Sequence, residues 1–127
     1  MRSKCVVVIV LGSFIGAACG GGNTKHGIDA SVWDRYCKHG SELLTALNAS
    51  AAGRMSDKEV LDRMARAQHD LHDDALAARK KSGDMGAKIQ ALADSVGRAE
   101  AMLEGKKVPN WNDNELTVRA EAIGKCD

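Results

Sequence analysis

Aromatic side chains, proline and long apolar runs are all scarce in this chain of 127 residues. It contains one Phe, one Tyr, two Trp and one Pro. Proteins that bind single-stranded nucleic acid stack the bases on several exposed aromatic rings beside basic side chains, and this composition does not supply them. The 18 Lys and Arg side chains balance 17 Asp and Glu side chains, so no excess positive charge attracts a polyanion. We therefore expect no nucleic-acid partner.

The apolar residues that are present favour helices. Most of them are Leu, Ile, Val, Met and Ala, and small side chains such as Ala let helices pack closely together. No run of alternating β-branched residues lies between turn residues after Cys19, so the pattern predicts no strand there. The composition thus predicts an all-α domain.

The first 19 residues have the layout of an export signal. Met1–Lys4 is short and basic, Cys5–Ile15 is mostly apolar, and Gly16–Cys19 closes the segment with small residues. An apolar helix of about 11 residues would be about 16 Å long, well short of the roughly 30 Å hydrocarbon core. We expect residues 1–18 to be a signal peptide that is removed, not a permanent membrane span.

Ile15-Gly16-Ala17-Ala18-Cys19 resembles the lipobox of bacterial lipoproteins. The resemblance implies cleavage before Cys19, acylation of that cysteine with two or three chains such as palmitate, and membrane lipid as a partner. The sequence departs from the pattern at Gly16, where a large aliphatic residue is usual. The alternative is ordinary signal-peptidase cleavage after Ala18, which would release a secreted soluble protein.

Cysteine counting favours the lipidated form. Of the four cysteines, Cys5 leaves with the signal, and a lipidated Cys19 leaves only Cys37 and Cys126. Two thiols in an oxidising compartment predict one disulfide, whereas a free Cys19 would leave an odd thiol. A redox-active pair is the alternative, but Cys37 and Cys126 are far apart in sequence and form no C-x-x-C motif.

Residues 19–28 are predicted to be the lipidated cysteine and a flexible, glycine-rich tether, and residues 29–127 a helical domain. Apolar residues at spacings of three and four predict four helices in this domain. They run from near Asp29 or Ser31 to Ala51, from Ser56 to Lys81, from Met85 to Leu103, and from near Asn112 to the region of Ile123. Gly40 leaves open whether the first helix is continuous or broken into two.

Short connections between these helices predict an up-down-up-down bundle. In that topology the first and fourth helices are neighbours, so the start of one lies near the end of the other. This arrangement would bring Cys37 close to Cys126. The fold class we expect is therefore a small antiparallel bundle of three to four helices, closed by one disulfide.

The richest set of potential ligand groups lies in the second helix. His69, His72 and Asp73 are at positions i, i+3 and i+4 and share a helix face, so they could bind a divalent metal or a small ligand. The alternative is an ordinary solvated surface. The spacing is not the His-Glu-x-x-His signature of zinc proteases, and the chain has no G-x-S-x-G nucleophile motif.

The expected function follows from location more than from chemistry. The sequence predicts a non-enzymatic, membrane-anchored lipoprotein outside the cytoplasm, with no cofactor and no catalytic residues. Its helical domain would bind another envelope protein or serve a structural role. The alternatives are a metal- or small-ligand-binding protein that uses His69, His72 and Asp73, and a secreted helical protein or enzyme inhibitor.

Overall fold

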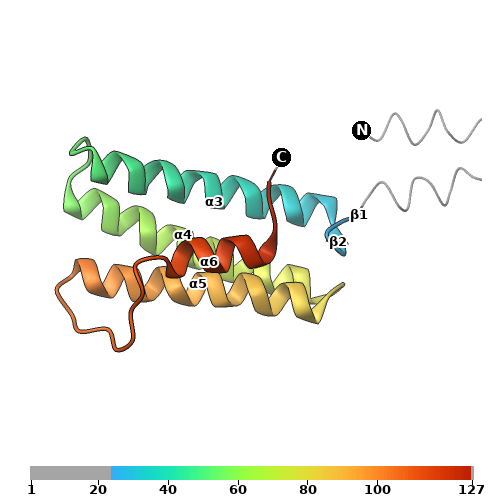
Figure 1. The fold of residues 1–127 in the computed structure, drawn as a ribbon. Helices are drawn as coiled ribbons and strands as arrows, with labels where there is room; N and C mark the ends of the chain where they lie inside the picture. Colours follow the sequence, from blue (N-terminus) through green and yellow to red (C-terminus); the bar gives the residue numbers. More distant parts are fainter. Residues whose placement is uncertain (1–23, 127) are drawn as a thin grey trace, which may run out of the picture.

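A computed structural model describes residues 24–126, which form an antiparallel helical bundle (Figure 1). Its elements are β1 (Thr24–Lys25), β2 (Ile28–Asp29), α3 (Ala30–Ala51), α4 (Asp57–Arg79), α5 (Gly83–Leu103) and α6 (Glu115–Ile123). Successive helices alternate in direction, as predicted. The predicted signal peptide (residues 1–18) and Cys19 lie outside the described residues.

Helix α3 is continuous through Gly40, which answers the question that the sequence left open. A side chain at position 40 would meet no atom within 4 Å, so this glycine marks neither a break nor a close contact. The buried face of α3 is formed by Val32, Trp33, Tyr36, Leu43 and Ala46. The helix thus packs on the bundle along most of its length.

Both central helices begin at a serine that caps the first turn. The Ser56 hydroxyl accepts a hydrogen bond from the Glu59 backbone N–H at 3.2 Å, at the residue where the sequence predicts this helix to begin. Ser82 does the same for Met85 at 3.1 Å. The turn between α4 and α5 is so short that Ser82, three residues after the last residue of α4, already caps α5. Each cap satisfies a backbone donor that lacks a partner within the helix.

Helices α4 and α5 form the centre of the bundle. Five fully buried side chains fill their contact and the adjoining layer: Val60, Met64, Leu71, Ile89 and Val96. The helices approach closely at Gly86, where an added methyl group would lie 3.0 Å from the Ala75 carbonyl oxygen and would overlap the Arg79 side chain. The residue at this crossing must therefore be glycine.

Residues 24–29 form a small hairpin, so the expectation of no strand is wrong for this segment. Lys25 pairs with Ile28, and His26 and Gly27 make the two-residue loop with φ angles of 55° and 80°. Positive φ at both positions is what a type I′ hairpin turn requires. Ile28 is completely buried, so the last residues of the predicted tether belong to the packed domain.

Helix α6 is short and packs on α5 through an arginine. Arg98 on α5 contacts the Glu115 carboxylate at 3.1 Å and donates to the Pro109 carbonyl at 2.9 Å. The helix begins at Glu115, three residues after the predicted start, because Asn112 accepts a hydrogen bond from the Asn114 N–H and forms a turn first. Trp111 is half-buried against the core. Arg98 thus holds the middle of the connection before α6 and the first residue of that helix.

Candidate functional site

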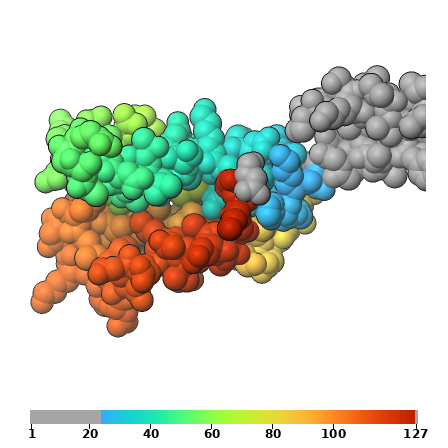
Figure 2. All heavy atoms as spheres, turned by 45° about the horizontal axis from the view of Figure 1, so that its top comes forward, coloured from blue at the N-terminus to red at the C-terminus, as the bar shows by residue number. Residues whose placement is uncertain are grey.

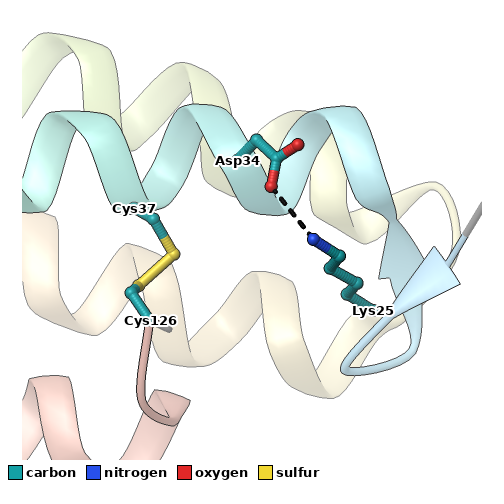
Figure 3. Close-up of a disulfide and its surroundings, with 4 residues drawn as sticks. All are labelled: Lys25, Asp34, Cys37 and Cys126. Carbon is teal, nitrogen blue, oxygen red and sulfur yellow. Dashed lines mark hydrogen bonds and ion pairs between the residues drawn. A yellow bond between two sulfur atoms is a disulfide. The ribbon is translucent and has the colours of Figure 1, made fainter. Parts of the chain in front are cut away.

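A disulfide joins α3 to the segment that follows α6 (Figure 3). Cys37 and Cys126 have an S–S distance of 2.06 Å and a Cα–Cα distance of 5.7 Å, and they are 89 residues apart in sequence. The predicted pairing is confirmed. Because α3 is the first helix of the bundle and Cys126 is the last described residue, the bond closes almost the whole domain into one covalent loop.

The C-terminal segment also packs on the hairpin. The His26 ring stacks on Trp33 with ring centroids 3.8 Å apart. A side chain at Gly124 would meet the His26 ring at 3.1 Å, and the φ of Gly124 is 126°, so this position admits only glycine without rearrangement. Beside the disulfide, Lys25 lies 3.5 Å from Asp34 (Figure 3). The hairpin, α3 and the C-terminal segment therefore meet at one end of the bundle.

The one charged side chain buried among the described residues is Asp74 on α4, with 2% of its surface exposed. The His39 Nδ1 atom on α3 lies 2.6 Å from its carboxylate, and the Arg35 Nε atom lies 3.8 Å away. The His39 Nε2 atom is 3.7 Å from Asp70. These four side chains, Arg35, His39, Asp70 and Asp74, form a cluster that connects α3 to α4.

Sequence reasoning missed this cluster. Asp74 follows Leu71 by three residues and precedes Ala78 by four, so it lies on the apolar stripe of α4. The place of Asp74 on this stripe could have indicated the cluster, because a buried carboxylate requires a partner from another element. No spacing within α4 could have identified His39, since the two residues meet only when α3 packs on α4.

Burial is the main influence on Asp74 and raises the pKa of its carboxyl, while the hydrogen bond and charge of His39 and the charge of Arg35 oppose that rise. An ionised carboxylate can only accept a hydrogen bond, so His39 Nδ1 is the donor when the Asp74 carboxyl is ionised. The Nε2 side then faces Asp70 and a depression of about 50 Å³ whose lining includes Arg63 and Arg66.

Catalytic dyads also use a carboxylate to orient an imidazole. Such a dyad needs a nucleophile within reach of the imidazole Nε2 atom. The depression beside His39 is lined by His39, Glu42, Leu43, Arg63, Arg66, Ala67 and Asp70, which include no Ser, Thr or Cys. The cluster is therefore better suited to connecting two helices than to nucleophilic chemistry. Removing one partner of a buried ion pair costs about 3 to 5 kcal/mol.

The structure does not bring His69, His72 and Asp73 together as a metal site. His69 lies 3.5 Å from Asp73 on the exposed face of α4, whereas the His72 Nδ1 atom contacts Gln90 on α5 at 2.7 Å. Gln90 in turn donates to Asp94 at 2.9 Å. Across residues 24–126, no group of three or more His, Cys, Asp or Glu side chains is arranged to hold a metal ion.

A shallow depression of about 420 Å³ lies over the same two helices, and its lining combines the two histidines with Gln68, Gln90, Asp94 and Ala65. Sites for small organic ligands are mostly apolar, with a few polar groups, and this lining has the opposite balance. Within the described part of the chain, no helix is long and apolar enough to cross a membrane. No known protein family matches the sequence, and neither a curated protein nor a solved structure matches it.

Proposed function

We propose that this protein is a lipid-anchored, non-enzymatic lipoprotein that acts outside the cytoplasm. Its helical domain would serve a binding or structural role in the cell envelope, with another envelope protein as partner. The anchor would be acylated Cys19, exposed after removal of residues 1–18.

The observation that carries this proposal is the disulfide between Cys37 and Cys126. Structural disulfides persist in oxidising compartments and are rare in the cytosol, so the bond supports export independently of the N-terminal sequence. It also uses both cysteines that follow Cys19. Cys19 is then left as the cysteine to be modified, in the sequence context that resembles a lipobox.

Two or three acyl chains would make the attachment firm. Each buried methylene contributes about 0.8 kcal/mol, so a single chain binds marginally while two hold the protein stably. In this proposal the attachment depends on acylation of a single residue, Cys19.

A non-enzymatic role is supported by how the polar groups of the domain are used. Asp74 and His39 pair with each other inside the interface between α3 and α4. His72 is held by Gln90, and Arg98 secures Glu115 and the preceding loop. These side chains hold helices in place, which is what a scaffold or a binding domain requires.

Metabolic labelling with palmitate tests the anchor directly. The wild-type protein should take up label, a Cys19→Ser variant should not, and the matched Cys5→Ser variant should label normally because Cys5 leaves with the signal. The mass of the labelled protein should show an N-terminal, acylated Cys19. If the Cys19→Ser protein is still labelled, or if the envelope contains a soluble form that begins with an unmodified Cys19, the proposal is wrong.

A further inference from the structure

The hairpin and the turn between α4 and α5 lie at the same end of the bundle. Lys81 in the turn reaches Asp29 in β2, with 3.9 Å between the charged atoms. Figure 2 shows the blue residues of the hairpin directly beside the yellow residues of the turn. This is also the end at which the described chain begins, at Thr24.

Positive charge dominates this surface. Arg79, Lys80 and Lys81 are consecutive and all exposed, and with Lys25 they form what we call the basic end. Three acidic side chains lie nearby, and each is paired: Asp34 with Lys25, Asp29 with Lys81, and Asp84 with Lys88. Within residues 24–126, Arg79 and Lys80 contact no acidic side chain. Two exposed positive charges on the turn therefore remain uncompensated.

The opposite end of the bundle provides a natural comparison. Helix α5 has 21 residues, so its two ends are about 31 Å apart. Lys106 and Lys107 follow this helix and are also exposed, but Lys106 lies 3.4 Å from Glu104. A second basic pair thus exists at the far end of the same helix.

We propose that the basic end lies against an anionic phospholipid surface. This inference rests on the proposed acylation of Cys19, because the anchor determines which end of the domain is held near the membrane. Five residue steps separate Cys19 from Thr24, and a fully extended chain spans at most about 18 Å over that distance. That reach is shorter than the bundle, since the 22 residues of α3 measure about 33 Å.

The chemistry of the turn favours lipid over a fixed protein partner. Two of the three basic side chains of the turn, Lys80 and Lys81, are lysines. Lysine is a compact point charge on a flexible stem and does not require the fixed geometry that arginine forks recognise. Lipid headgroups move laterally and can gather beneath such charges. Electrostatic attraction acts over a Debye length of about 8 Å at physiological salt, so only the end that the anchor holds close to the surface can use it. Basic clusters beside an anchor recognise anionic membranes in this way.

Amine labelling of the acylated full-length protein tests the proposal. The protein would be reconstituted in vesicles of phosphatidylcholine alone, or of phosphatidylcholine mixed with phosphatidylglycerol, and treated with a water-soluble amine reagent. Mass spectrometry would then report the modification of Lys80 and Lys81, with Lys106 and Lys107 as internal controls. An anionic surface concentrates protons about threefold, which lowers the reactive, uncharged fraction of a nearby amine by the same factor.

We expect Lys80 and Lys81 to react at least about threefold more slowly on anionic than on neutral vesicles, and to recover at high salt, while Lys106 and Lys107 change little. An Arg79→Gln substitution should reduce the protection of Lys80.

Equal labelling on both vesicles, with the protein still bound to them, would overturn the inference and leave the anchor intact. Protein that binds neither vesicle would refute the anchor, and the inference with it. Protection in native envelopes but not on anionic vesicles would indicate an acidic protein partner instead and would also overturn the lipid assignment.

Discussion

Removing the disulfide between Cys37 and Cys126 should destabilise the domain strongly. Cys37 and Cys126 close a loop with a sequence separation of 89. A cross-link of that span lowers the conformational entropy of the unfolded chain, and the chain-entropy relation gives an upper estimate of about 4.6 kcal/mol. Domains of this size are stable by about 5 to 15 kcal/mol in total. Loss of the bond therefore removes a large share of the stability.

The experiment compares three samples in a nonionic detergent: the oxidised protein, the same protein after reduction, and a Cys37→Ala/Cys126→Ala variant. Helix content followed by circular dichroism during urea unfolding gives the free energy of unfolding and its dependence on denaturant. We expect reduction and substitution each to lower the free energy of unfolding by about 3 to 4.5 kcal/mol. The slope against urea should rise, because an unfolded chain without the cross-link exposes more surface.

Agreement between the reduced protein and the double variant is the internal control, since only the variant changes side chains. A loss below about 1 kcal/mol in both samples would refute the reasoning. It would mean either that the unfolded chain is already compact without the cross-link or that the native bond is strained. A large loss in the variant alone would instead identify packing of the two side chains as the cause.

The remaining predictions concern single positions. His39→Ala should lower the free energy of unfolding by about 3 to 5 kcal/mol, because it leaves Asp74 buried without its closest partner. The control Lys38→Ala, at an exposed neighbour, should change it by less than about 0.5 kcal/mol in the same urea titration. Hydrogen bonds from Ser95 and Arg98 lower the pKa of Glu115 below its ordinary value of 4.5. The resulting stability is present above that pH and is lost as the pH falls through the lowered folded-state pKa. In acid titrations a Glu115→Gln variant should therefore lose less stability below pH 4.5 than the wild type, and identical curves would contradict this. Gly40→Ala should stabilise the domain by about 0.5 to 1 kcal/mol, because the helix interior favours alanine and the position has open space around it. A calorimetric Tm that does not rise would contradict that expectation.

Patterns within short stretches of the sequence, together with the number of cysteines, were enough to predict most of the architecture. The apolar spacing of α4 and α5, the start of α4 near Ser56 and the counting of cysteines all depend on residues close together in sequence or on simple pairing. They predicted the helix order, the alternating directions and the disulfide between Cys37 and Cys126. Helix geometry repeats every few residues, so 20-residue segments carry enough signal to be recognised.

The features that were missed depend on contacts between elements or on very short segments. The hairpin has two residues in each strand, too few for an alternating pattern, although His26-Gly27 is a sequence that suits a two-residue turn. The partnership of Asp74 with His39 forms only when α3 packs on α4. His72 likewise turned out to bind Gln90 across two helices, which no pattern within α4 could indicate.

The cross-link also determines what a single backbone cut can do to this molecule. Any protease that cleaves once between residues 38 and 125, including the exposed connection before α6, leaves the two pieces covalently joined through Cys37 and Cys126. Shedding of any part of the bundle would then require a second cut or a reductant. A nicked molecule would keep its full mass in a non-reducing gel and separate into two bands only after reduction.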